Sequence, residues 1–347
     1  MTIAFSWNGL PQYAARLMRA AIEQLDEPCA VIGSRPEVPV AGMEEVLGQP
    51  AHWVDAQRPI SWADLGLTPP SIFVQSGWAY PAFNALGSET RRRGGKVIGM
   101  MDNNWRGDFR QRVMGPIGFR LLHRRKFDRM LVAGQSGARL ARYWGMPKDA
   151  IRTGMYGADP AIFSCQTALA ERPREFLFVG QFIARKDVLG LCEAFLAAGD
   201  QLQDWTLRLC GSGVLRDEIP RHPRIHVEAF VQPEALHARF DRARVFVLPS
   251  LFEAWGLVVH EAALSGCAMI LSDAIGSAPD LATSVNALSY RAGDRSELSS
   301  RLVEIANWAP RRLHEASAES IRLARAFGPA TFASQVKLFV EDLRSDA

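Results

Sequence analysis

Two glutamates separated by seven residues, Glu253 and Glu261, are the side chains of this sequence best placed to act together on a ligand. Carboxylates accept hydrogen bonds from hydroxyl groups, so the pair suits a sugar or a ribose. The backbone amides around Gly256, between them, suit a phosphate joined to that sugar. An ordinary alternative stays open for each residue: Glu253 as a solvated loop side chain, and Glu261 as an acid favoured by the dipole of an early helical turn.

The sequence around this pair predicts a strand, a loop and a helix. Residues 243–248 form a short apolar run rich in β-branched side chains, which is typical of a buried strand. Gly256 precedes a helical run over residues 257–264. Glu253 then lies on the loop and Glu261 on the helix, so both can point into the crevice at the carboxyl end of a parallel sheet, where α/β proteins bind ligands.

Three further motifs accompany this segment: Gly-Gln-Phe-Ile-Ala-Arg-Lys at 180–186, a glycine loop at 209–215 and Tyr-Gly-Ala-Asp at 156–159. Together with the Glu-x7-Glu segment, they resemble the motifs of the retaining glycosyltransferases of family 4, in the same order. The resemblance implies the GT-B fold, an α/β architecture of two doubly wound parallel-sheet (Rossmann-like) domains facing a central cleft. It also implies a C-terminal helix that crosses back to the N-terminal domain.

Strands and helices alternate along the chain, as two doubly wound sheets require. We predict strands of the first sheet at residues 4–7, 29–32, 72–75, 96–101 and 130–133. Those of the second are predicted at 176–180, 205–209, 227–230, 245–248 and 269–271. The last stretch, 324–343, is amphipathic. We therefore expect an N-terminal acceptor-binding domain over 1–164, a nucleotide-sugar-binding domain over 165–328, and a helix over 329–347 that packs back on the first domain.

The resemblance also implies roles for the charged residues of the second domain. Lys186 would meet the negative charge that develops on the departing diphosphate. Gln181 stands where the family usually has an arginine, and Arg185, next to Lys186, is placed to supply the missing charge. Glu253 would lie near hydroxyls of the transferred sugar. Two solvated loop cations remain the alternative for Arg185 and Lys186.

Donor binding is implied for a second set of residues. Glu261 would hold the ribose hydroxyls, and the amides of Gly256 and Leu257 would face the diphosphate. Gly211 and Gly213 lack a Cβ, so the backbone can approach a nucleotide closely there. The set implied to bind the donor is Gly180, Gln181, Gly211, Gly213, Gly256, Leu257 and Glu261.

Asp102 is the candidate of the first domain. It follows a predicted strand, where the family often has a His-Asp pair facing the transferred sugar, but Met101 replaces the histidine. A role for Asp102 as a cap of the following segment is an equal alternative. His260, beside Glu261, is expected to face away from the ligand rather than to act as a base.

The amino-acid composition indicates the general class to which this protein belongs. The chain has 347 residues, of which 48% are hydrophobic and 22% charged, typical of a soluble globular protein. No apolar run is long enough to span a bilayer, and the sequence leads directly into a first strand, so we expect a cytoplasmic location without a signal peptide. Five scattered cysteines and the lack of an Asp-x-Asp pair argue against a metal site, and we expect no cofactor besides the nucleotide-sugar donor.

Charge is distributed unevenly. Residues 1–165 hold 20 Lys and Arg against 14 Asp and Glu, whereas the remainder holds 20 against 23. The basic segments 91–96 and 120–127 suggest contact with an anionic membrane surface, with an ordinary solvated helix face as the alternative. Nucleic-acid binding is disfavoured because no known module accompanies the charge.

The sequence thus predicts a retaining, metal-independent glycosyltransferase. It would move a hexose-type sugar from a nucleoside diphosphate to a saccharide or lipid-linked acceptor, as in the synthesis of bacterial surface polysaccharides or glycolipids. Two alternatives stay open: a nucleotide-sugar epimerase or hydrolase of the same fold, and a non-catalytic nucleotide-sugar-binding subunit.

Overall fold

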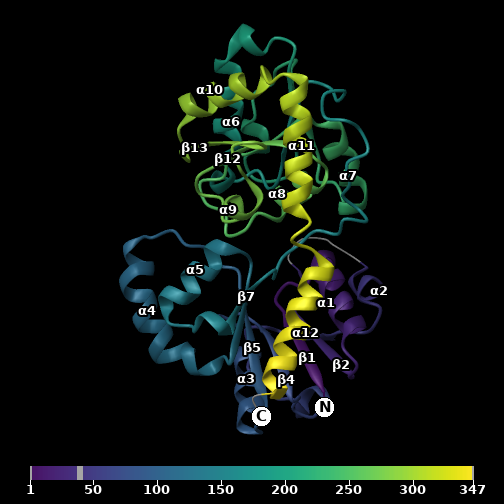
Figure 1. Cartoon of the computed structure of the whole chain (residues 1–347), viewed down its shortest axis with the longest axis vertical. Helices are drawn as coiled ribbons and strands as arrows, with labels where there is room; N and C mark the ends of the chain where they lie inside the picture. Colours follow the sequence, from purple (N-terminus) through teal and green to yellow (C-terminus); the bar gives the residue numbers. More distant parts are fainter. Residues whose placement is uncertain (1, 37–41, 346–347) are drawn as a thin grey trace. The chain divides into compact units, whose positions relative to one another are not determined.

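A computed structural model describes residues 2–36 and 42–345. The chain divides into two compact units (Figure 1). Unit 1 comprises Met1–Asp159 with Phe327–Ala347, and unit 2 comprises Pro160–Ala326. The chain therefore passes between the units twice, near residues 159 and 326, whereas the sequence predicts borders at 164 and 328.

Unit 1 is built on a sheet of seven parallel strands within the described residues. In spatial order they are β3 (His52–Trp53), β2 (Cys29–Gly33), β1 (Ile3–Trp7), β4 (Ile72–Ser76), β5 (Lys96–Met101), β6 (Arg129–Val132) and β7 (Ile151–Thr153). The five strands predicted from sequence are all present. The two short edge strands, β3 and β7, were not predicted.

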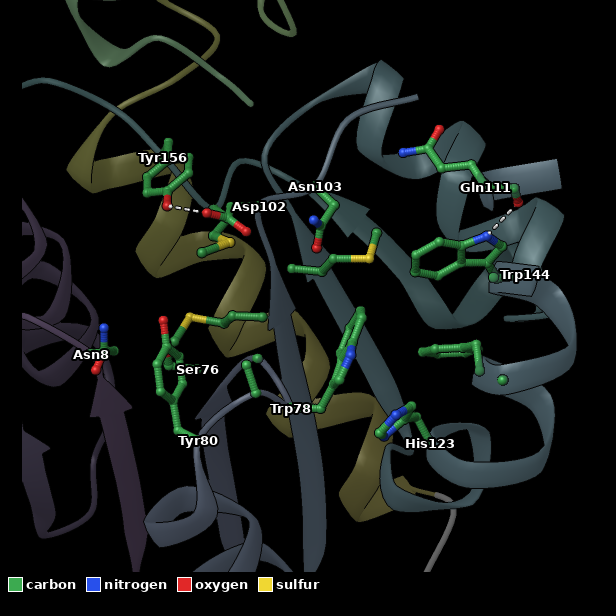
Figure 2. A pocket seen from close by; sticks show the side chains of 18 of the residues that line it. Asn8, Ser76, Trp78, Tyr80, Asp102, Asn103, Gln111, His123, Trp144 and Tyr156 are labelled. Atoms are coloured by element: carbon green, nitrogen blue, oxygen red, sulfur yellow. Dashed lines mark hydrogen bonds between the residues drawn. The ribbon is translucent and has the colours of Figure 1, made fainter. Parts of the chain in front are cut away.

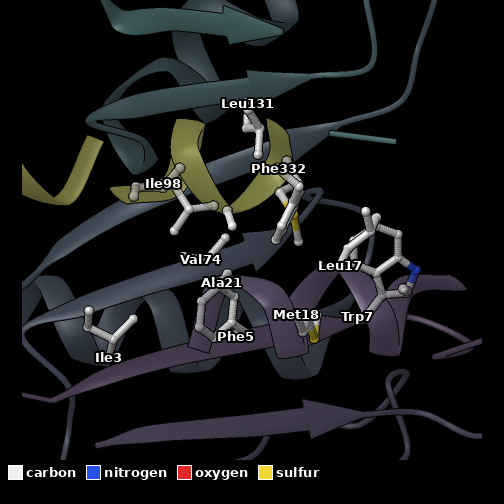
Figure 3. Packing of buried hydrophobic residues seen from close by; sticks show 14 of the residues in the cluster. Ile3, Phe5, Trp7, Leu17, Met18, Ala21, Val74, Ile98, Leu131 and Phe332 are labelled. Carbon is white, nitrogen blue, oxygen red and sulfur yellow. The ribbon is translucent and has the colours of Figure 1, made fainter. Parts of the chain in front are cut away.

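Helices cover both faces of this sheet. Those that precede β6 are α1 (Gln12–Gln24), α2 (Met43–Leu47), η1 (Ala63–Leu65), α3 (Pro81–Arg92), η2 (Arg110–Met114), α4 (Gly115–Gly118), η3 (Phe119–His123) and η4 (Arg124–Lys126). Those that follow it are α5 (Gln135–Trp144), η5 (Lys148–Ala150) and α12 (Pro329–Ser345). Helix α12 packs against α1, and Figure 3 shows Phe332 of α12 beside apolar side chains of the sheet.

The C-terminal amphipathic stretch is the helix α12. The predicted stretch 324–343 begins five residues too early, because α11 ends at Ala324 and α12 begins at Pro329. Gly328 separates them with a φ of +121°, a conformation that favours glycine. A Cβ at Gly157 would lie 2.1 Å from the nitrogen of Gly328, so the two segments that link the units touch at a pair of glycines.

Unit 2 contains a six-stranded sheet, again counted over the part of the chain that the structure describes. In spatial order its parallel strands are β10 (Ile225–Glu228), β9 (Thr206–Cys210), β8 (Glu175–Val179), β11 (Val245–Leu248), β12 (Ala268–Ser272) and β13 (Ala287–Tyr290). The strand predicted at 227–230 lies two residues earlier, and β13 was missed. All four residues of β11 are buried, as expected for a central strand covered on both faces.

The helices of unit 2 are η6 (Ala184–Lys186), α6 (Val188–Ala197), η7 (Gly199–Leu202), η8 (Arg216–Glu218), α7 (Pro233–Arg242), α8 (Leu257–Leu264), α9 (Ala278–Leu281), α10 (Arg295–Ala306) and α11 (Pro310–Ala324). Helix α8 packs with α11, and α6 packs with α10. Each unit is thus a parallel sheet between helices, which confirms the predicted α/β class with two Rossmann-like domains. Among the described helices, none has the length and apolarity to cross a membrane.

Candidate functional site

Strand order places two loops of unit 2 side by side. Strands β8 and β11 are neighbours although β9 and β10 intervene in the sequence, so the order of the sheet reverses between them. Ligands of such folds bind outside the carboxyl ends of the strands at this point. The loops that leave β8 and β11 there are residues 180–187 and 249–256, and the Leu251 amide donates to the Arg185 carbonyl over 2.8 Å.

The loop that carries Glu253 is also held from its other side. The amide of Glu253 donates to the carbonyl of Ala274 over 3.2 Å, and its carbonyl accepts from the amide of Gly276 over 3.0 Å. The backbone at Glu253 is therefore fixed between the loop after β8 and the loop after β12. A fixed backbone limits the positions that the Glu253 carboxylate can reach.

The structure brings Lys186, Arg185 and Glu253 together. The Lys186 ammonium forms an ion pair with Oε2 of Glu253, and the two side chains are only 11% and 14% exposed. Arg185 approaches the same oxygen to 3.3 Å and donates to the carbonyl of Phe252 over 2.8 Å. Two cations thus share one carboxylate, and the cluster carries one net positive charge. Such a cluster suits an anion such as a diphosphate.

Backbone strain follows directly after Lys186. Asp187 has a φ of +49° and is the only non-glycine residue with a positive φ in the part of the chain that is described. It turns the chain from η6 into α6. Residues in this conformation persist only where surrounding structure holds them, and they concentrate at functional sites.

The N-terminus of α8 is open to an anion. Gly256 precedes it with a φ of +83°, and a Cβ at this position would lie 3.0 Å from the Cγ of Glu253. A larger residue would therefore be strained and would displace Glu253. No described side chain caps α8, and the amide of Val259 donates to the carbonyl of Gly256 over 2.9 Å, so the amides of Leu257 and Val258 remain available to a ligand.

Glu261 lies in the second turn of α8 without a protein partner. Its carboxylate accepts no hydrogen bond from any residue that the structure describes. The side chain keeps some solvent contact, yet protein surrounds it on most sides, and this burial raises the pKa of Glu261 to about 7. A half-buried carboxylate without donors is expected to accept hydrogen bonds from a ligand.

His260 is directed away from this site. Its side chain is fully buried and its Nε2 lies 2.8 Å from the carbonyl oxygen of Ala324, the last residue of α11. Burial lowers the pKa of His260 to about 4, so the imidazole is neutral at physiological pH. The residue joins α8 to α11.

The predicted glycines have a reason within the fold itself. A Cβ at Gly211 would lie 1.9 Å from the carbonyl oxygen of Gly180, and one at Gly213 would lie 2.4 Å from that of Phe182. The loops after β8 and β9 therefore pack backbone against backbone, with the Phe182 amide donating to the Ser212 carbonyl over 2.8 Å. Gln181, which stands between Gly180 and Phe182 in the loop after β8, has an exposed side chain.

Unit 1 has its own pocket, at the corresponding end of its sheet. A cavity of about 860 Å³ opens where β1, β4 and β5 end, at Asn8, Ser76 and Asp102 (Figure 2). Much of its lining is aromatic: Trp7, Tyr13, Trp78, Tyr80, Phe119, Trp144 and Tyr156. Broad aromatic faces together with a few polar groups are typical of pockets that bind organic ligands.

Polar and charged side chains also line this pocket: Asn8, Ser76, Asp102, Asn103, Arg106, Arg110, Gln111 and His123. Asp102 is the predicted site residue that lies in unit 1, and Figure 2 shows its carboxylate meeting the Tyr156 hydroxyl, at 3.4 Å. His123 lies beside the ring of Trp78, with 5.5 Å between centroids. Burial and the charge of Lys126 lower the pKa of His123, so it is expected to be neutral. Burial raises the pKa of Tyr156 well above its usual value.

The aromatic lining was not predicted from the sequence. Their position at the ends of strands could have identified these residues. Trp7 and Trp78 lie at the carboxyl ends of β1 and β4, two neighbouring strands between which the order of the sheet reverses. Periodicity alone assigns such residues to the core. Knowing the strand order is what identifies them as pocket residues.

Comparison with known proteins supports this architecture. No curated protein sequence matches the chain. Residues 173–307 match the family model for glycosyl transferases group 1. Among solved structures, HepE of Anabaena in complex with UDP and glucose is similar at a TM-score of 0.73, with 13% identity over 99% of this chain and 100% of that one.

Two further solved structures are similar over at least 97% of their lengths. Sucrose-phosphate synthase from Thermosynechococcus elongatus has a TM-score of 0.70, with 16% identity and coverage of 100% of both chains. A Listeria monocytogenes protein assigned as a UDP-N-acetylglucosamine 2-epimerase has a TM-score of 0.69, with 11% identity over 100% of this chain and 97% of that one. At these identities the likeness concerns the fold. The chain therefore has the two-domain fold of the GT-B glycosyltransferases, and its residues 173–307 match glycosyl transferases group 1.

Proposed function

We propose that this protein is a retaining glycosyltransferase that moves a hexose-type sugar from a nucleoside diphosphate to a saccharide or lipid-linked acceptor. The observation that carries the proposal is the cluster of Lys186, Arg185 and Glu253 at the point of unit 2 where the sheet order reverses. The uncapped N-terminus of α8 and the unpartnered carboxylate of Glu261 accompany this cluster. Together they match the parts of a nucleotide sugar: hydroxyls, diphosphate and ribose.

The reaction breaks the bond between the anomeric carbon and a phosphate oxygen, and negative charge then accumulates on the leaving diphosphate. Lys186 and the first amides of α8 would stabilise that charge, and this help is greatest in the transition state. The acceptor hydroxyl would attack from the same face as the leaving group and pass its proton to a phosphate oxygen. Because protein cations supply the positive charge, we propose that the reaction needs no metal ion.

We propose that the aromatic pocket of unit 1 binds the acceptor. Sugar rings present C–H faces that pack on aromatic rings, while their hydroxyls need a few polar partners. Asp102 would accept a hydroxyl hydrogen bond there, and the ring of Trp78 would offer the apolar face. Surface polysaccharide or glycolipid synthesis is the pathway class that fits such an acceptor.

The nucleotide part of the proposal has a direct test. We expect one of UDP, GDP or ADP to raise the melting temperature on the order of 5 °C at a hundredfold excess over its Kd, because binding stabilises only the folded state. Differential scanning fluorimetry measures this shift. If none of the three shifts the transition at millimolar concentration, the proposal fails.

A second function, nucleotide-sugar epimerase or hydrolase, is favoured by one observation, the similarity to the protein assigned as an epimerase. The two functions differ in their need for an acceptor. A glycosyltransferase consumes its donor only when an acceptor is present, whereas an epimerase or hydrolase does so without one. Donor turnover that is independent of any added saccharide would support the second function.

We further propose that unit 1 contacts an anionic membrane surface through residues 109–126. Phe109, Val113, Ile117 and Leu121 follow one another at every fourth position and are 74%, 41%, 56% and 78% exposed. The segment includes the π-helices η2 and η3, whose wider turns keep residues four apart on nearly the same face. We call these four side chains the apolar row. The basic stretch 120–126 lies on the same segment, as in helices that bind anionic interfaces.

Vesicle binding tests the apolar row. We expect flotation with vesicles that contain phosphatidylglycerol but not with neutral phosphatidylcholine, and weaker binding as salt is raised. Leu121→Ser should lower binding by about tenfold, since a buried leucine side chain contributes about 1.5–3 kcal/mol. Val285→Ser is the control, because Val285 is 42% exposed but lies in unit 2. Equal, negligible flotation with both lipids would remove the membrane proposal.

A further inference from the structure

A second, shallower pocket of unit 1 is not used by the proposed reaction. It has a volume of about 600 Å³ and is lined by Trp105, Arg112, Arg139, Arg142 and Tyr143. These residues come from three places: the loop after β5, the helix η2 and the helix α5. Its lining consists of three guanidinium groups and two aromatic rings.

The aromatic floor of this pocket is held rigidly. The rings of Trp105 and Tyr143 meet edge to face with 5.0 Å between centroids. The Tyr143 hydroxyl donates to the carbonyl of Arg112 over 2.9 Å, and the amide of Trp105 donates to the Ser136 hydroxyl over 2.9 Å. The guanidinium of Arg139 lies over the Trp105 ring, 4.4 Å from its centroid. Two helices and a loop are thus joined around the rings.

The positive charge of the pocket has no counterpart in the protein. Within residues 2–36 and 42–345, none of Arg112, Arg139 and Arg142 forms an ion pair with a carboxylate. Asp108 is the nearby acid in the sequence, and its carboxylate pairs with Arg106 at 3.1 Å. Three exposed cations held around one floor repel each other, so binding an anion between them would lower their free energy.

One residue of the pocket, Arg112, lies on the helical segment that carries the apolar row. Arg112 immediately precedes Val113, which is a member of the row. If the row enters the acyl region of a bilayer, a guanidinium beside it lies at the depth of the lipid phosphates. Arginine binds phosphate oxygens through two parallel hydrogen bonds, and the rings of Trp and Tyr favour the same interfacial depth.

We infer that this arginine–aromatic pocket binds the headgroup phosphate of an anionic phospholipid while the apolar row inserts beside it. The inference rests on the membrane proposal made above and adds to it a defined lipid site. It assigns a role to Trp105 that diffuse surface charge does not require: the ring holds Arg139 in place and forms the floor under the headgroup.

The test compares three variants on vesicles of phosphatidylcholine with one third phosphatidylglycerol. Arg139→Gln with Arg142→Gln should lower the fraction that floats by on the order of tenfold or more, because each arginine near an anionic surface contributes about fivefold. Arg58→Gln with Lys148→Gln removes the same charge from exposed positions of unit 1 outside the pocket and should have a much smaller effect. Trp105→Leu should lower flotation severalfold without any change of charge, and Trp105→Phe should restore most of it.

The outcomes separate the two proposals. If the unmodified protein does not float with these vesicles, both the membrane proposal and the lipid site are wrong. If it floats, but the two double variants are affected equally and Trp105→Leu is not, the surface acts through diffuse charge and only the lipid site is wrong. Melting temperatures of all variants establish that each is folded, and the donor-binding shift in unit 2 should be unchanged in every one.

Discussion

Lys186→Ala is expected to lower the single-turnover rate of sugar transfer by about 10²-fold or more, while donor affinity falls less. The reason is that the ammonium meets a charge that is greatest in the transition state. The variant should fold, because Glu253 keeps Arg185 as a partner at 3.3 Å. Lys337→Ala, exposed on α12, removes a cation elsewhere and serves as the control. An ordinary rate for Lys186→Ala would refute the proposed mechanism.

Variants of Arg185 test whether this residue supplies the positive charge that is missing at Gln181. Its guanidinium shares an oxygen of Glu253 with Lys186, yet its side chain is 42% exposed and can still reach a ligand. We expect Arg185→Ala to slow turnover and the addition of Gln181→Arg to restore part of the rate. Residues that act on one partner are not additive, so single-turnover rates of the four proteins in this cycle measure the coupling. Additive effects would remove the compensation but leave the role of Lys186 intact.

Much of the fold was predictable from local pattern. Buried parallel strands such as β11 are continuous apolar runs, and α8 begins and ends at the predicted residues, since Gly256 marks its start. The strands that were not predicted can be recognised only from their pairing with neighbouring strands. β3 has two residues, β7 reads Ile-Arg-Thr, and β13 reads Ala-Leu-Ser-Tyr with an exposed serine, so none of the three has a strong apolar signal.

The functional site likewise combines residues that were predicted from the sequence with contacts that were not. Spacing indicated Glu253 and Glu261, and the family resemblance implied Lys186 and Arg185; the structure joins three of these four residues in one cluster. Sequence could not show that Glu253 lies between two cations, because that contact joins positions 67 and 68 residues apart. The pocket of unit 1 escaped prediction for a related reason: its aromatic residues gather only when β1, β4 and β5 lie side by side.

Glu261→Gln is expected to have opposite effects on nucleotide binding and on stability. Affinity for the nucleotide that binds should fall on the order of tenfold or more, because a hydrogen bond to a charged group is worth about 1.5–3 kcal/mol. The pKa of Glu261 near 7 adds a pH dependence. Ribose hydroxyls that donate to the carboxylate favour its ionised form, so binding releases a proton, and affinity should rise from pH 6 to 8 and then level off.

The stability of the nucleotide-free protein, in contrast to its affinity for nucleotide, should fall as pH rises. The folded pKa of Glu261 lies above its unfolded value, so the folded state holds an extra proton between about pH 4.5 and 7 and loses stability as pH rises through this window. Glu261→Gln removes that loss and should raise the free energy of unfolding at pH 8 by about 1–3 kcal/mol. Glu315→Gln, an exposed acid of α11, is the control for both measurements. Calorimetric titration at three pH values measures the affinity, and thermal melts measure the stability. Lower nucleotide affinity together with higher stability of the variant is the result expected for a carboxylate that is kept for a ligand. A variant that binds nucleotide normally would return Glu261 to a structural role.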